Sequence, residues 1–189
     1  NVDAGTLTVV DLVTNDLGAG TGTGTKDINI TTGLASFTKV VGWAWARDVD
    51  VDVTGVGGRV TVTAPLTMNT ANATNFDLLA NGTLTFNGLV TLTNGQITNS
   101  GTAGTMNFNA GLAVDQTSAT FTSMAGETIN FGGNLTNSSV ALVLNATSNV
   151  FFNGGTPTVT PNSNITFGNV QVNNGIAVVF ANAGGVIAI

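Results

Sequence analysis

The sequence contains no cysteine, histidine or tyrosine, and it has very few charged residues. Without cysteine there can be no disulfide framework, no thiolate metal site and no cysteine nucleophile. Without histidine a catalytic triad lacks its usual general base. Charged residues make up 7% of the chain, against about 25% in a typical soluble protein. Polarity therefore comes from Thr, Asn and Gly, and these absences argue against an enzyme.

Positive charge is scarce and scattered. The net charge is −6, and the only cations are Lys26, Lys39, Arg47 and Arg59. No basic stripe exists, which excludes nucleic acid as a partner. The most apolar segment, residues 175–189, is interrupted by Gly and Asn and is too short for a membrane-spanning helix. At 189 residues the chain fits one domain.

One short segment recurs four times. It reads GTLTFNG from Gly82, GTMNFNAG from Gly104, GETINFGG from Gly126 and SNVFFNGG from Ser148. Each copy contains a phenylalanine at the equivalent place, and these are Phe86, Phe108, Phe131 and Phe152. Their nearly even spacing gives a repeat of about 22 residues, a period typical of proteins built from stacked repeats.

Each repeat contains three short runs in which apolar and polar residues alternate, separated by Gly or Asn. Alternation with period two predicts β-strands. Gly and Asn accept the positive φ angles that sharp corners require. The sequence therefore predicts an all-β parallel β-solenoid (β-helix) with coils of about 22 residues. The four phenylalanines are expected to point inward and to stack from coil to coil.

A second architecture stays open. Short strands with regular turns also occur in an antiparallel β-sandwich, here a pilin-like subunit completed by strand addition. The repeat is clear only in residues 59–189, whereas residues 1–58 contain longer, atypical strands within the same predicted domain. In-phase repetition and the Gly/Asn corners favour the solenoid.

Asp48, Asp50 and Asp52 alternate with valines in the sequence RDVDVDV. In a strand the three carboxylates share one face, about 6.6–6.8 Å apart in succession. Such oxygen ligands suit Ca²⁺, although calcium sites usually converge from a loop. The simpler interpretation is a solvent-facing edge, and no other cofactor is predicted.

Trp43 and Trp45 lie two positions apart and so share a face of one strand. A pair of aromatic rings can form a platform for sugars, which gives an alternative function: a carbohydrate-binding module on a β-helical scaffold. Core packing or an interface between protomers is the favoured interpretation, because Trp is enriched in both.

Catalysis on a β-helix requires facing carboxylates, as in glycosidases. Glu127 is the only glutamate, and its nearest acidic neighbour in the sequence, Asp115, comes roughly half a repeat earlier. That separation predicts different sides of a coil. No ionisable side chain follows Glu127, and the chain is therefore predicted not to be an enzyme.

The ends of the repeat array carry no recognisable cap. The chain closes on GIAVVFANAGGVIAI, and GTLTVVDLV lies near its start. Uncharged strands of high β propensity pair with other strands when they are left bare. The sequence therefore predicts assembly strands at both ends, through Leu7 and Val9 at one end and Ile176, Val178, Val186 and Ile187 at the other.

The repeats NGTLTFNGLVTLTNGQITNSG and AGTMNFNAGLAVDQTSATFTS resemble those of filamentous-haemagglutinin-like adhesins and autotransporter-associated repeat proteins of bacteria. The resemblance covers roughly residues 59–167 and is compositional and periodic. It implies a secreted or cell-surface structural protein, either a filament subunit or a segment of an adhesin stalk. The expected partners are copies of the chain joined end to end, or the rest of a longer surface protein.

Overall fold

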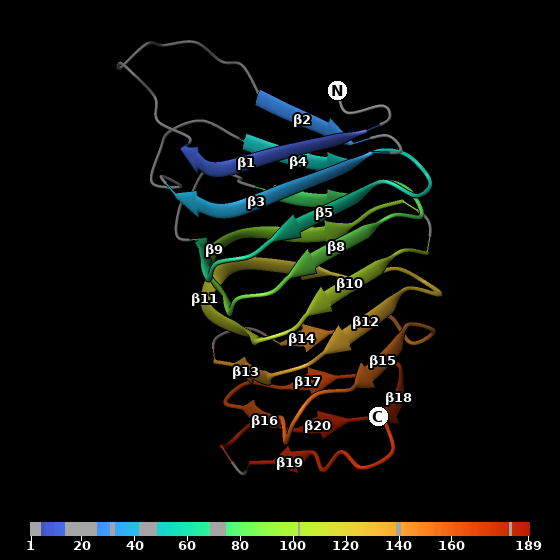
Figure 1. The fold of residues 1–189 in the computed structure, drawn as a ribbon. Helices are drawn as coiled ribbons and strands as arrows, with labels where there is room; N and C mark the ends of the chain where they lie inside the picture. The colour runs from blue at the N-terminus through green and yellow to red at the C-terminus, as the bar shows by residue number, and fades with distance from the viewer. Residues whose placement is uncertain are drawn as a thin grey trace.

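The structure is a computed structural model that describes residues 5–13, 26–30, 33–41, 49–68, 75–101, 103–138, 141–181 and 183–189. These residues form twenty β-strands and no helix. The strands stack along one axis, with β1 and β2 at one end and β18, β19 and β20 at the other (Figure 1).

The first sheet takes one strand from each successive coil. In β8, β10, β12 and β15 the second and fourth residues are buried, as period-two alternation requires. In spatial order the strands are β1 (Thr6–Val13), β3 (Leu34–Val41), β5 (Arg59–Val62), β8 (Thr83–Phe86), β10 (Thr105–Phe108), β12 (Thr128–Phe131), β15 (Asn149–Phe152) and β18 (Asn169–Val172).

The second sheet bends around a corner through its two longest strands, β9 and β11. The start of β9 pairs with β6, and its end pairs with β7. The strands of this sheet are β2 (Lys26–Ile30), β4 (Val49–Val53), β6 (Leu66–Met68), β7 (Asn75–Leu78), β9 (Val90–Asn99), β11 (Gly111–Thr122), β13 (Asn134–Asn137), β16 (Thr158–Pro161) and β19 (Val179–Phe180).

A third, small sheet completes the later coils. It contains β14 (Leu142–Val143), β17 (Ile165–Thr166) and β20 (Ile187–Ala188). The coil between β12 and β15 therefore has three strands, β12, β13 and β14, one in each sheet. This matches the three short alternating runs of each sequence repeat.

Every strand pairing in the described residues is parallel. The predicted parallel β-solenoid is confirmed, and the antiparallel sandwich is wrong. The coils shorten along the stack, since Thr6 pairs with Leu34 in the first coil, whereas Asn149 pairs with Asn169 near the end. The longer early coils blur the sequence repeat before residue 59, yet β1 to β4 belong to the same two sheets as the later strands.

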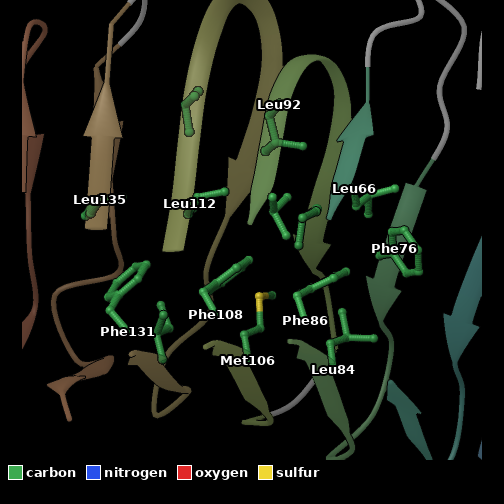
Figure 2. Packing of buried hydrophobic residues seen from close by; sticks show 14 of the residues in the cluster. Leu66, Phe76, Leu84, Phe86, Leu92, Met106, Phe108, Leu112, Phe131 and Leu135 are labelled. Carbon is green, nitrogen blue, oxygen red and sulfur yellow. The ribbon is translucent and has the colours of Figure 1, made fainter. Parts of the chain in front are cut away.

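The core is a set of columns, each made of residues in register on successive strands. Phe86, Phe108, Phe131 and Phe152 form one column, with ring centroids 5.4, 5.6 and 5.5 Å apart and interplanar angles of 12°, 18° and 25°. Leucines of the second sheet face this column across the interior (Figure 2). Each ring thus stacks on at least one equivalent ring in a neighbouring coil, and offset stacking of this kind adds about 0.5–1.5 kcal/mol per pair beyond area burial.

Asparagine side chains connect the coils on the outward face of the first sheet. Asn107 Nδ2 donates to Thr85 Oγ1 at 3.0 Å, and Asn130 Nδ2 donates to Asn107 Oδ1 at 2.8 Å. Asn109 Nδ2 donates to Asn87 Oδ1 at 2.8 Å just beyond the strand ends. Each of these bonds joins equivalent positions of successive repeats, so the repeat period also aligns the polar surface.

We expect Gly111→Ala to lower the free energy of unfolding by at least about 2 kcal/mol. Gly111 has a φ of +113°, and a Cβ there would meet the carbonyl oxygen of Asn134 in the next coil. Gly57→Ala is the matched control, because Gly57 has a φ of +86° and no atom within 4 Å of such a Cβ. Urea unfolding should show the smaller loss for Gly57→Ala, about 1–2 kcal/mol. Equal losses would contradict close packing between coils at this corner.

Candidate functional site: the open end of the solenoid

The last coil of the solenoid leaves its core side chains exposed. Val172 in β18 is 43% exposed and Phe180 in β19 is 48% exposed, whereas their register partners Phe152 and Val159 in the preceding coil are fully buried. Among the described residues, no strand pairs with the outer edges of β18, β19 and β20. The columns of apolar core side chains therefore end at an apolar surface that is exposed to solvent.

Backbone hydrogen bonds join the strands of the last coil to those of the preceding coil. Asn173 N donates to the carbonyl oxygen of Phe152 at 3.0 Å, and Ala181 N donates to that of Val159 at 2.9 Å. In the third sheet Phe167 N donates to the carbonyl oxygen of Ala188 at 2.9 Å. The final strands are thus hydrogen-bonded from one side, and in the described part of the chain no strand pairs with their other edge, where a terminal strand presents free N–H and C=O groups.

No charge protects this edge. The sequence after Glu127 contains no Asp, Glu, Lys or Arg. Natural edge strands commonly carry inward-pointing or flanking charges that prevent pairing with other chains. An exposed apolar edge without such charges can bind another β-strand by main-chain hydrogen bonds and side-chain packing.

The predicted assembly residues lie at or near the two ends of the stack. Leu7 in β1 is 37% exposed, Val186 beside β20 is 63% exposed, and Val178 and Ile187 pack partly against the core. Ile176 lies before β19 and is partly exposed. Val9 lies in β1 in register with Phe37 of β3.

Two residues of the open end were not anticipated from the sequence, namely Val172 and Phe180. Val172 is the register partner of Phe152 in the same column, and Val170 is in register with Val150. Val172 thus stands one repeat after Phe152, so the phenylalanine register would have identified it had it been extended by one coil.

The aspartates of β4 lie beside further polar residues. Asp50 is in register with Asn75, and Asp52 with Asp77 in β7. Burial, and then the charge of Asp52, raise the pKa of Asp77 from 3.8 to about 6. The described residues contain no group of three or more acidic side chains placed to hold a metal ion. Asp48 lies outside the described residues, so the predicted calcium site stays a prediction.

Trp43 and Trp45 also lie outside the described residues. Their assignment to a sugar platform or an interface therefore stays a prediction.

Glu127 is fully buried, which was not anticipated from the sequence. Thr128 N donates to the Gly104 carbonyl and Asn149 N to the Glu127 carbonyl, so Glu127 takes the corner position that Gly104 holds one coil earlier. Its Oε2 accepts a hydrogen bond from Met124 N at 3.0 Å. A glutamate at a position that is glycine in the preceding repeat is the signal that would have identified it.

Burial raises the pKa of Glu127 from 4.5 to about 7, against the hydrogen bond from Met124 N and the nearby Asn99 amide, which both lower it. Asn99 is also fully buried. It lies close enough to affect the carboxyl group, but Asn99 Nδ2 and Glu127 Oε1 do not reach hydrogen-bond geometry with each other or with another described group. Glu127 is therefore a buried carboxylic acid, and its burial favours the neutral form over the charged one.

No helix in the described part of the chain has the length and apolar character needed to cross a membrane. Comparisons of the chain with protein-family models, with curated proteins and with solved structures found no match.

Proposed function

We propose that this protein is a structural segment of an extracellular surface filament or adhesin stalk, extended coil by coil through its open end. The observation that carries the proposal is the last coil, where Val172 and Phe180 end two core columns in solvent. A solenoid coil buries its apolar side only against its neighbours. An uncovered terminal coil therefore favours the addition of a further coil.

The side of the rod is suited to a passive, load-bearing role. Asparagine and threonine side chains hydrogen-bond from coil to coil, as in the Asn130–Asn107–Thr85 series. Backbone ladders run through all three sheets. Such continuous bonding resists proteolysis, because a protease requires a locally unfolded segment. The low charge of the chain also lets neighbouring rods approach closely.

The composition and period that resemble bacterial adhesin repeats support a location outside the cell. No described residue favours the alternative carbohydrate-binding function, whose tryptophans lie outside the described part of the chain.

Negative-stain electron microscopy of the purified chain tests the proposal. We expect regular fibres one subunit wide that lengthen as the protein concentration rises. Monodisperse monomers at high concentration would contradict assembly through the open end.

A further inference from the structure

We infer that the open end binds a second copy of this chain, with β18 of one copy adding in parallel to β1 of the next. This inference rests on the proposed function and names the partner and the register. Asn169 would lie beside Thr6, Val170 beside Leu7 and Gln171 beside Thr8.

The register follows from the first sheet, in which β1 and β18 are the two terminal strands. One column runs through the sheet from Leu7 by way of Ala35 and Val60 to Val150 and Val170. The members of this column between Leu7 and Val170 are buried apolar residues, namely Ala35, Val60, Leu84, Met106, Ile129 and Val150. A copy stacked one coil beyond β18 therefore places Leu7 on Val170 and continues the column without a change of residue type.

The outward positions match as well. Thr6 and Thr8 are exposed on β1, and Asn169 and Gln171 are exposed on β18. These side chains are uncharged hydrogen-bonding groups of the kind that already connect coils along this face, as Asn107 and Thr85 do. Contact between the two strands therefore sets polar groups against polar groups and apolar groups against apolar groups.

The open edge of β18 is suited to binding a β-strand rather than a helix. An amphipathic helix laid over the last coil would cover Val172 but would leave the N–H and C=O groups of β18 unpaired. A parallel strand satisfies both, and β1 is a terminal strand with a complementary sequence in the same sheet. Because the two edges differ, the contact is head-to-tail and does not close on itself, which produces a filament rather than a dimer.

Disulfide trapping tests the register, and the cysteine-free chain makes the two introduced thiols the only ones present. In a Thr8→Cys/Gln171→Cys variant the two Cα atoms would lie about 4.8 Å apart across the joint, within the range that a disulfide spans. Within one copy the two positions are separated by seven strand spacings, about 34 Å, so a disulfide has to link two copies. The matched control is Thr6→Cys/Gln171→Cys, which shifts one thiol along its strand to a Cα separation of about 8 Å.

We expect the first variant, after mild oxidation, to give a ladder of dimers, trimers and longer species on a non-reducing gel. The control should give at least about tenfold less, because its Cα separation exceeds the disulfide range. If the protein forms fibres but the two variants give equal disulfide ladders, or neither gives one, the register is wrong and the proposed function stands. If neither fibres nor ladders form, both the register and the proposed function are wrong.

A charge at the edge provides a second measurement. Val172→Asp should raise the concentration at which fibres form by at least about a hundredfold, because the joint would bury an unpaired carboxylate. The matched control is Val143→Asp, since Val143 in β14 is 60% exposed on the side of the rod. Similar effects of the two substitutions would show that contacts along the side, not the end, hold the copies together.

Discussion

Phe108→Asp is expected to abolish cooperative folding. Phe108 is fully buried and contacts three aromatic rings, those of Phe86 and Phe131 in its own column and that of Phe121 in β11. Removing the ring leaves a cavity that costs about 3–5 kcal/mol, and the aspartate adds an unpaired charge in the core. Together these losses rival the whole stability of a domain, about 5–15 kcal/mol. Circular dichroism and thermal melting measure the outcome.

Phe151→Asp is the matched control. Phe151 is in β15 directly before Phe152, and it lies on the outward face of the strand, where it is only partly buried. The same substitution there should change the free energy of unfolding by no more than about 1 kcal/mol. A Phe108→Asp variant that melts like the parent chain, or that melts no lower than Phe151→Asp, would contradict the stacked column.

Stability should fall as the pH rises from about 5 to about 8, because of Glu127. Its pKa is raised from 4.5 in the unfolded chain to about 7 in the folded one. Between these values the folded state holds a proton that the unfolded state has lost, so the stabilisation is complete below pH 4.5 and is lost as the pH rises through about 7. We expect Glu127 alone to lower the free energy of unfolding by about 2–3 kcal/mol over this range. Urea unfolding at several pH values measures the change.

Glu127→Gln should remove most of this slope, because the amide keeps the shape of the carboxylic acid without ionising. Asp77 contributes a smaller slope of the same sign, since its pKa is raised from 3.8 to about 6. Asp115→Asn is the control, because Asp115 is exposed at the surface of β11. An unchanged slope in Glu127→Gln would mean that the carboxyl group does not ionise in a buried site.

The strand pattern and the core column were predictable from the sequence because both depend on local alternation and on a repeated period. Phe86, Phe108, Phe131 and Phe152 are almost evenly spaced, and in a stack of parallel coils residues one repeat apart lie in register and pack against each other. The side chains that end the columns are harder to predict, since β19 and β20 are each only two residues long. In strands this short, a shift of one residue decides which side chains end a column.

The burial of Glu127 and Asn99 could not be predicted from alternation alone. Glu127 lies at a corner, outside any strand, and its burial depends on how the coil before it turns. Asn99 ends β9 in a turn where Gly101 N donates to its side-chain oxygen at 3.2 Å. These two polar residues, far apart in the sequence, meet only because the chain completes a full coil between them.

Helical reconstruction of the fibres by cryo-electron microscopy tests most directly whether the open end continues the solenoid. Continued stacking predicts strand spacing of about 4.8 Å that runs across the joint between copies without a break, with Gln171 of one copy beside Thr8 of the next. Fibres whose copies meet along their sides, with the last coil still open to solvent, would contradict it.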